Sequence, residues 1–198
     1  MNRPGALATR TAAVRERDVA LVEDAARGDA EAFDALIRPR LDRLFRMAVA
    51  ITRNESDARD AVQEASVSAW RELPRLRGPQ QFDAWLAQIL VNACRGLLRS
   101  RRRVHVREIA VDDMAASSAW EASVATAGPA DATSEVEAIR RAFDRLDPTV
   151  RSLLVLHYVE ERPLAEIGRI LGTPVGTIKW RLSKARGALD RALEVEHR

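Results

Sequence analysis

Apolar side chains recur at intervals of three and four residues through three successive stretches of the first hundred residues. The stretches cover residues 33–51, 58–73 and 82–97. This spacing places the apolar side chains of each stretch on one face of an α-helix, and none of the stretches alternates apolar and polar residues as a β-strand does. The sequence therefore predicts a compact, all-helical domain over residues 21–103.

Proline and polar residues indicate where these helices should end. Pro39 should kink or break the first helix, and Pro74 should end the second. Residues 52–56 are polar turn material, in which Ser56 or Asp57 could cap the second helix. The side chains that we expect in the core are Phe33, Leu36, Ile37, Leu41, Leu44, Phe45, Ala48, Ile51, Ala58, Val62, Ala65, Ala69, Leu73, Phe82, Trp85, Leu86, Ile89, Leu90, Ala93 and Leu97.

Composition supports an all-α fold of two small domains. Hydrophobic residues make up 46% of the chain and aromatic residues only 5%, which supplies a core but favours helices over a sandwich or barrel. Residues 104–133 have no apolar period, and seven carboxylates but no lysine or arginine lie between residues 108 and 139. We therefore expect a disordered tail over residues 1–20, a flexible acidic linker over 104–133 and a second helical domain over 134–198.

The second domain should begin with two helices. Ile139, Ala142, Phe143 and Leu146 form one apolar stripe. Asp147 and Pro148 then suit the start of the next helix, because proline is favoured in a first turn. The side chains expected on its buried face are Val150, Leu153, Leu154, Leu156 and Tyr158.

Residues 163–182 form a helix-turn-helix pattern. Pro163 suits the first turn of a helix over 163–171, and Gly172 can supply the left-handed residue that ends it. Thr173 and Pro174 suit the start of a second helix over 174–193. Gly168 leaves room for the two helices to cross closely. The apolar face of the first helix consists of Leu164, Ile167 and Leu171.

The second helix of this pattern has two distinct faces. One should pack against the core and carries Val175, Ile178, Leu182, Ala185 and Leu189; the other carries Thr177, Trp180, Arg181 and Lys184, with Lys179 and Arg186 beside them. Cations suit phosphates, arginine suits guanine acceptors, and an apolar ring suits a thymine methyl group. Cations on an exposed helix are often merely solvated and then have no binding role. A large tryptophan ring outside the core, however, favours the interpretation that this face binds a partner.

A cluster of arginines precedes the acidic segment and suggests a polyanionic partner. Its members are Arg95, Arg99, Arg101, Arg102, Arg103 and Arg107. The alternative without a binding role is a solvated helix end, whose cations match the negative pole of the helix dipole. That interpretation explains two arginines better than six.

Several classes of function find no support in the sequence. Cys94 is the single cysteine, which excludes an internal disulfide framework, and we expect it to be a small buried hydrophobe. His105 and His157 lack ligand partners at metal-binding spacing. The chain shows no nucleophile motif and no phosphate loop, so we expect neither an enzyme nor a cofactor or metal. No stretch is long enough to span a bilayer and the N-terminus lacks a signal sequence, so we expect a cytoplasmic protein.

In two regions the chain resembles the sigma factors of bacterial RNA polymerase, of the compact extracytoplasmic-function (ECF) group. Residues 57–64, followed by Ala69 and Trp70, resemble region 2.2, and residues 82–86 with 91–95 resemble regions 2.3 and 2.4. Leu146 to Pro148, with the segment 153–158, resembles region 4.1. Residues 174–182, with Ala185 and Arg186, resemble region 4.2.

The resemblance implies three sets of contact residues. Those implied for core RNA polymerase are Asp57, Asp60, Gln63, Glu64 and Trp70. Those implied for the −10 promoter element are Arg75, Arg77, Gln81, Trp85, Asn92, Arg95, Arg99 and Arg102, with the loop Leu76–Gln81 and Asn92 capturing a base that leaves the stack. Those implied for the −35 element are Thr177, Lys179, Trp180, Arg181, Lys184 and Arg186.

The implied partners are core RNA polymerase, promoter DNA and an anti-sigma factor, without a small-molecule substrate or direct membrane insertion. Two alternatives stay open at this point. A dimeric helix-turn-helix regulator would explain residues 163–186 but would leave residues 57–103 without a role. A helical protein-interaction adaptor would make the basic patches incidental, and it would show no salt-dependent affinity for DNA.

Overall fold

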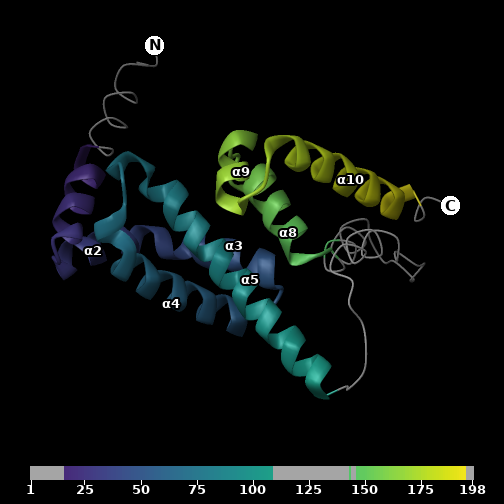
Figure 1. Cartoon of the computed structure of the whole chain (residues 1–198), viewed down its shortest axis with the longest axis horizontal. Helices are drawn as coiled ribbons and strands as arrows, with labels where there is room; N and C mark the ends of the chain where they lie inside the picture. Colours follow the sequence, from purple (N-terminus) through teal and green to yellow (C-terminus); the bar gives the residue numbers. More distant parts are fainter. Residues whose placement is uncertain (1–15, 109–142, 144–145, 195–198) are drawn as a thin grey trace, which may run out of the picture.

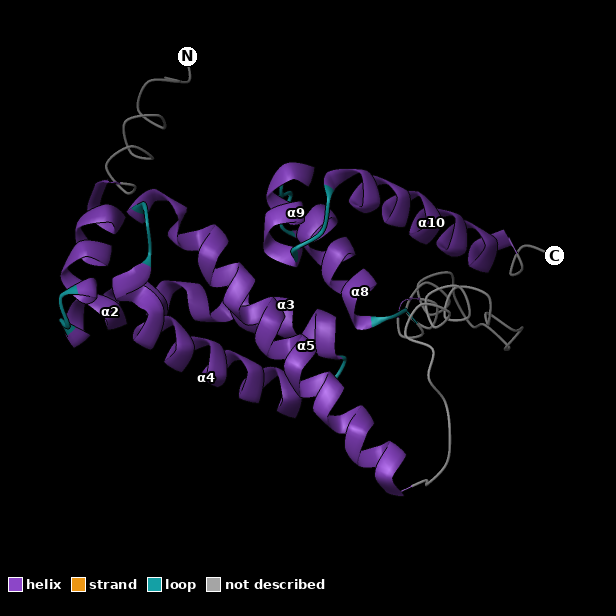
Figure 2. Cartoon of the chain, viewed as in Figure 1, coloured by secondary structure: helices purple, strands orange, loops and turns teal. Residues whose placement is uncertain are grey.

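The structure is a computed structural model, and it describes residues 16–108, 143 and 146–194. Side chains are described for residues 16–101, 143 and 146–187. Every regular element of this part of the chain is helical (Figure 2), which confirms the all-α prediction. No helix in the described ranges is long and apolar enough to cross a membrane.

The first unit consists of a helix over residues 16–26 and the elements that follow it to residue 108 (Figure 1). Its longest helix crosses the others and extends beyond them as an arm (Figure 1). The elements are α2 (Ala30–Ile37), η1 (Arg38–Arg40), α3 (Leu41–Thr52), α4 (Glu55–Glu72), η2 (Leu73–Arg75), η3 (Pro79–Gln81) and α5 (Phe82–Glu108).

Local sequence explains where these helices start and stop. Pro39 lies inside the 3₁₀ turn η1, which separates α2 from α3 as predicted. The side chain of Asn54 caps α4 by accepting from the backbone N–H of Asp57 at 3.0 Å. The prediction that Ser56 or Asp57 would be the cap was therefore wrong, because the left-handed residue Arg53 lets α4 begin immediately after α3.

The core of the first unit lies where α3, α4 and α5 meet. Small side chains line α4, so α3 and α5 approach it closely. Leu41 is an exception to the predicted stripe: it is exposed, because the break at Pro39 turns the start of α3 away from the core. The fully buried residues of this core include Leu36, Met47, Ile51, Ala58, Ala65, Ala69, Leu73, Leu86, Leu90, Val91 and Cys94.

Between residues 147 and 194, which the structure describes without a gap, the second unit is built from four helices. They are α8 (Pro148–Leu154), η4 (Val155–Val159, a π-helix), α9 (Leu164–Leu171) and α10 (Val175–Glu194). Asp147 caps α8 and Pro148 is its first residue, as predicted. Tyr158 was predicted to be buried but is 50% exposed, because the switch to π-helical hydrogen bonding in η4 rotates it outward.

The helix-turn-helix prediction is confirmed between α9 and α10. Gly172 ends α9 with φ of 61°, and a Cβ on Gly168 would lie 2.9 Å from the carbonyl oxygen of Thr173. The hydroxyl of Thr173, predicted to cap the second helix, donates to the carbonyl oxygen of Leu171 instead. Val175 is exposed rather than in the core, because it lies in the turn at the very start of α10.

The structure moves two of the predicted boundaries of the first domain. Residues 16–20, assigned to a disordered tail, are helical, and α5 continues to Glu108, inside the expected linker. Residues 1–15 and the acidic segment 109–133 lie outside the described residues.

The two units pack against each other. Helices α8 and α9 contact α5, and α8 with η4 contacts α3, so the second unit lies along one side of the first (Figure 1). The buried apolar residues of both units form one continuous cluster.

Candidate functional site

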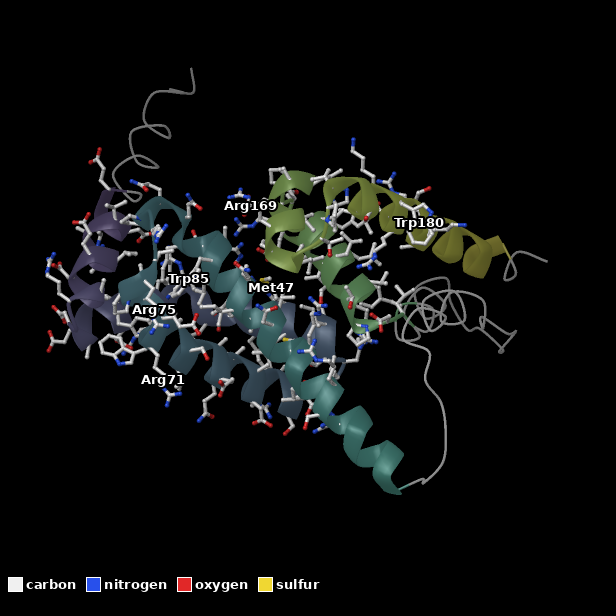
Figure 3. The ribbon with its side chains drawn as sticks, in the orientation of Figure 1. Met47, Arg71, Arg75, Trp85, Arg169 and Trp180 are labelled. Carbon is white, nitrogen blue, oxygen red and sulfur yellow. The ribbon has the colours of Figure 1, made fainter. Side chains whose placement is uncertain are left out.

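Helix α10 presents an aromatic and cationic face to solvent. Its opposite face is buried through Ile178, Leu182 and Ala185. On the outer face, Trp180 is 46% exposed, and the Nζ atom of Lys184 lies 5.9 Å from the centroid of its ring; Figure 3 shows Trp180 on this helix. Lys179, Lys184 and Arg186 are exposed, whereas Thr177 and Arg181 are half-buried. The division predicted for this helix holds for the buried residues and for Trp180 and Lys184, whereas Thr177 and Arg181 are only partly exposed.

Arg186 has an additional contact within the second unit. Its Nε donates to the hydroxyl of Tyr158, and its guanidinium lies 5.5 Å from the centre of that ring. The outward rotation of Tyr158 in the π-helix η4 therefore provides a support for a cation at the edge of the α10 face.

The residues assigned to the −10 element follow one stripe along α5 and the loop before it. Trp85, Asn92 and Arg99 recur at helical spacing, with Asn92 and Arg99 exposed and Trp85 half-buried. Gln81, just before α5, and Arg75 and Arg77, in the segment before it, are also exposed. Gln81 and Asn92 are eleven positions apart, about 16 Å along a helix axis, so they can contact only different nucleotides. The side chain of Arg102 is outside the described part of the chain.

Arg95 of α5 lies within electrostatic range of Arg181 on α10. It is half-buried, and its pKa is lowered first by that burial, then by the positive charge of Arg99, and also by Arg181 of α10, against an opposing contribution from Asp147. Arg181 of α10 is therefore near enough to Arg95 of α5 for the two positive charges to repel each other.

The exposed face of α4 carries the residues assigned to polymerase binding. Asp60, Gln63 and Glu64 are exposed, and Glu64 accepts a hydrogen bond from Ser68 at 3.2 Å. Trp70 is half-buried, with its ring edge-on to Phe33 at a centroid distance of 5.1 Å.

Asp57 does not belong to that surface. Its side chain is only 2% exposed, and it forms an ion pair with Arg101 of α5. The structure thus gives Asp57 an internal contact that holds α4 to the cationic half of α5.

Arg40 is a largely buried cation that the sequence analysis did not single out. Its Nε donates to Oδ1 of Asp83 at 2.7 Å, its Nη1 donates to the carbonyl oxygen of Leu36 at 2.7 Å, and its Nη2 donates to Asp18. A cavity of about 440 Å³ lies beside this cluster, and Gln80 and Gln81 form part of its wall. No sequence signal marks Arg40, because its partners lie 22 and 43 residues away in the chain.

Polar contacts also join the two units. Arg43 of α3 forms an ion pair with Glu160, whose side chain is 5% exposed. The hydrogen bond to Glu160 raises the pKa of Arg43 in spite of its partial burial. The buried Arg151 of α8 donates from Nε to the carbonyl oxygen of Ile51 at 2.8 Å.

Other chemistry is not suggested by the described residues. They include no group of His, Cys, Asp and Glu side chains that could hold a metal ion. Cys94 is fully buried, and burial raises the pKa of its thiol to about 12. It is therefore a core residue and not a reactive thiol.

Two family models match the chain, one over each of the two units. Sigma-70 region 2 matches residues 36–104, and Sigma-70, region 4 matches residues 136–189. RNA polymerase sigma-H factor of Pseudomonas aeruginosa is 30% identical over 184 residues, which cover 91% of this chain and 95% of that protein. ECF RNA polymerase sigma factor SigM of Mycobacterium tuberculosis is 34% identical over 169 residues, or 84% of this chain and 79% of that protein. The chain belongs to the ECF group of the sigma-70 family.

Solved structures agree with this assignment. The ECF sigma factor described here is similar to CnrH in its complex with the cytosolic domain of CnrY, with a TM-score of 0.60, 25% identity and coverage of 90% of this chain and 98% of that one. The fold is also that of RpoE from Bartonella quintana in its complex with the anti-sigma factor NepR, with a TM-score of 0.57 and 24% identity. As a sigma factor, this DNA-binding protein directs promoter recognition and transcription initiation. The helix over residues 16–26 lies outside both family matches.

Proposed function

We propose that this sigma factor divides its work among three surfaces. The exposed carboxylates and amide of α4 bind core RNA polymerase, α5 and the loop before it read and melt the −10 element, and the outer face of α10 reads the −35 element. The observation that carries the proposal is the α10 face, where an exposed tryptophan and several cations lie opposite a buried apolar face. Such a face suits base edges and phosphates in the major groove.

Capture of a melted base is assigned to the loop Leu76–Gln81. Gly78 adopts φ of 92°, a conformation that L side chains rarely adopt, and the 3₁₀ turn η3 then presents Gln80 and Gln81 to solvent. Amide side chains can donate to and accept from the Watson–Crick edge of a base that has left the stack. Asn92 contacts a different nucleotide of the same strand.

Promoter binding requires the two units to separate. The numbers −10 and −35 give the positions of the two elements in base pairs. The elements are therefore 25 base pairs apart, which is about 85 Å along B-form DNA. In the packed arrangement, α8 and α9 contact α5, and α8 with η4 contacts α3. The described arrangement is therefore a closed state, and core polymerase and promoter DNA stabilise an open one in which the linker spans the gap.

An anti-sigma factor is a further proposed partner. The Bartonella RpoE was solved with the anti-sigma factor NepR, and CnrH was solved with the cytosolic domain of CnrY. A protein that binds the closed state more tightly than the open state would keep the two promoter-reading surfaces together and block initiation.

Reconstitution with core RNA polymerase tests the whole proposal. Core polymerase is incubated with chromosomal DNA with and without the protein, and the 5′ ends of the transcripts are sequenced. We expect a new set of start sites that share upstream sequence elements. Identical start sites in both reactions would contradict the proposal, and binding of palindromic duplex DNA by the protein alone would favour a dimeric regulator instead.

A further inference from the structure

One guanidinium joins three segments at the start of α5. Arg40, only 14% exposed, donates to Asp18 of the helix over 16–26, to the end of α2 at Leu36 and to Asp83 in the first turn of α5. Its guanidinium carbon also lies 5.3 Å from the centre of the Phe82 ring. We infer that this cluster of Asp18, Arg40 and Asp83, the Arg40 cluster, positions the 3₁₀ turn Pro79–Gln81 for base capture.

The charges of the cluster make its geometry rigid. Burial alone would lower the pKa of Arg40, but the hydrogen bonds and negative charges of Asp83 and Asp18 outweigh it and raise the pKa. The guanidinium is planar and its donors are fixed in direction, so it holds both carboxylates and the Leu36 carbonyl in one arrangement. Without this cation, two carboxylates would face each other in a partly buried space.

The cluster acts on the turn through the chain itself. Asp83 lies two residues after Gln81, so fixing its carboxylate fixes the downstream end of η3. The positive φ of Gly78 defines the upstream end. The cavity of about 440 Å³ is lined by Asp18, Arg40 and Asp83 together with Gln80 and Gln81, and in the packed arrangement also by Arg162, Glu166 and Arg169 of the second unit. Gln80 and Gln81, the side chains assigned to base capture, therefore face the same cavity as the cluster.

This inference depends on the base-capture function proposed for the loop, and it adds positioning residues to it. Asp18 belongs to the helix over 16–26, outside the region 2 match, so this helix becomes part of the −10 module. The three residues position the turn; they need not touch DNA themselves.

The test compares how strongly each variant depends on single bases. Holoenzyme is reconstituted with wild-type protein, Arg40→Gln or the milder Asp83→Asn, on a promoter identified from its sequenced transcripts. Templates carry one abasic site at each −10 position of the non-template strand in turn. We expect the wild type to lose roughly tenfold in transcription at the captured position, because stacking and polar contacts to that base are lost. For both variants, we expect this penalty to fall to about twofold or less, since the misplaced turn no longer holds the base.

Arg38→Gln is the matched control, because Arg38 lies two residues away and pairs with Asp34 on the exposed surface of α2. It should keep the full abasic penalty. If Arg40→Gln and Asp83→Asn lower activity or thermal stability but keep the wild-type penalty, the cluster only stabilises the fold and the inference is wrong. If the wild type itself shows no position-dependent penalty, base capture by the loop is wrong, and the positioning role falls with it.

Discussion

Asp57 shows how burial changes the role of a residue within an acidic helix. It is nearly inaccessible and pairs with Arg101, whereas Asp60, three residues later, is exposed. We expect Asp57→Asn to lower the free energy of unfolding by about 1–3 kcal/mol, because it removes a buried charged partner of Arg101. Urea denaturation measures this loss. Binding of core polymerase to the folded protein should stay unchanged.

Asp60→Lys with Glu64→Lys provides the opposite case on the same helix. These exposed carboxylates contribute little to stability, since surface ion pairs are worth about 0–1 kcal/mol. We expect the double variant to unfold like the wild type but to lose co-purification with core polymerase. Normal co-purification would remove the α4 surface from the proposed interface, and a stability loss equal to that of Asp57→Asn would contradict the distinction between the two positions.

Arg181 and Lys184 should differ in what they read on the DNA. Arg181 is half-buried on α10 and has the planar donors that match guanine, whereas Lys184 is an exposed point charge. We expect Arg181→Ala to reduce discrimination between −35 sequences by about 1–3 kcal/mol. Lys184→Ala should weaken binding to all −35 sequences alike. It should also reduce the slope of log affinity against log salt concentration by the amount expected for about one phosphate contact. Competition footprinting of the holoenzyme at several salt concentrations separates these outcomes, and equal sequence preference in wild type and Arg181→Ala would exclude a base contact.

At the scale of elements, the crossing of α9 and α10 depends on one glycine. A Cβ on Gly168 would come within 2.9 Å of the Thr173 carbonyl oxygen, a backbone atom that cannot move alone. We expect Gly168→Ala to destabilise the second unit by about 1–3 kcal/mol and to weaken −35 binding, because α10 must shift. Thermal unfolding and footprinting measure both effects.

Gly176→Ala is the control for that change. Gly176 lies in the first turn of α10 and has no neighbouring atom within 4 Å of the added Cβ. Alanine there should be neutral or should stabilise the helix by up to about 1 kcal/mol. Since alanine is the better helix former, equal destabilisation by both substitutions could not come from helix propensity, and it would contradict a specific role for the close crossing at Gly168.

The elements themselves could be predicted from the sequence because each has a local cause. Pro39, the Asp147–Pro148 start and Gly172 act on the backbone within a few residues. Tyr158 was placed wrongly because helical spacing assumes 3.6 residues per turn, whereas η4 is a π-helix. The cap of α4 was placed wrongly because Asn54 competes with Ser56 and Asp57 for one position, and only the left-handed Arg53 decides among them.

The candidate site was predictable where a pattern on one helix defines it. The two faces of α10 follow from spacing alone. The Arg40 cluster and the Arg43–Glu160 pair could not be found this way, because each joins residues brought together only by the tertiary fold. The burial of Asp57 likewise depends on where α5 crosses α4.

At the scale of the whole molecule, two kinds of contact between the units hold the closed state together, and only one of them is sensitive to charge. The apolar contacts are indifferent to charge, but Glu160 is buried against Arg43, so its carboxylate requires a cation. Changing one charge should therefore shift the equilibrium toward the open state without replacing any apolar residue of the shared core.

Glu160→Arg should destabilise the closed state relative to the open state by about 2–4 kcal/mol, since it replaces attraction to Arg43 with repulsion in a partly buried space. Arg43→Glu added to it should close the protein again by restoring a pair of opposite charges. Spin or fluorescent labels on Ser56→Cys and Ser183→Cys, both at exposed positions, report the distance between α4 and α10. Cys94 will not compete for the labels, because it is buried and its pKa is about 12.

We expect one short distance in the wild type, longer distances in Glu160→Arg and recovery of the short distance in the charge-swapped double variant. Core polymerase with promoter DNA should give the long distance in all three proteins, because binding to two elements about 85 Å apart requires it. Arg38→Glu, which disrupts the exposed pair between Arg38 of η1 and Asp34 of α2, should leave the short distance unchanged. If the holoenzyme on promoter DNA kept the short distance, the two units would have to read both elements while packed together, and the separation of the units would be wrong.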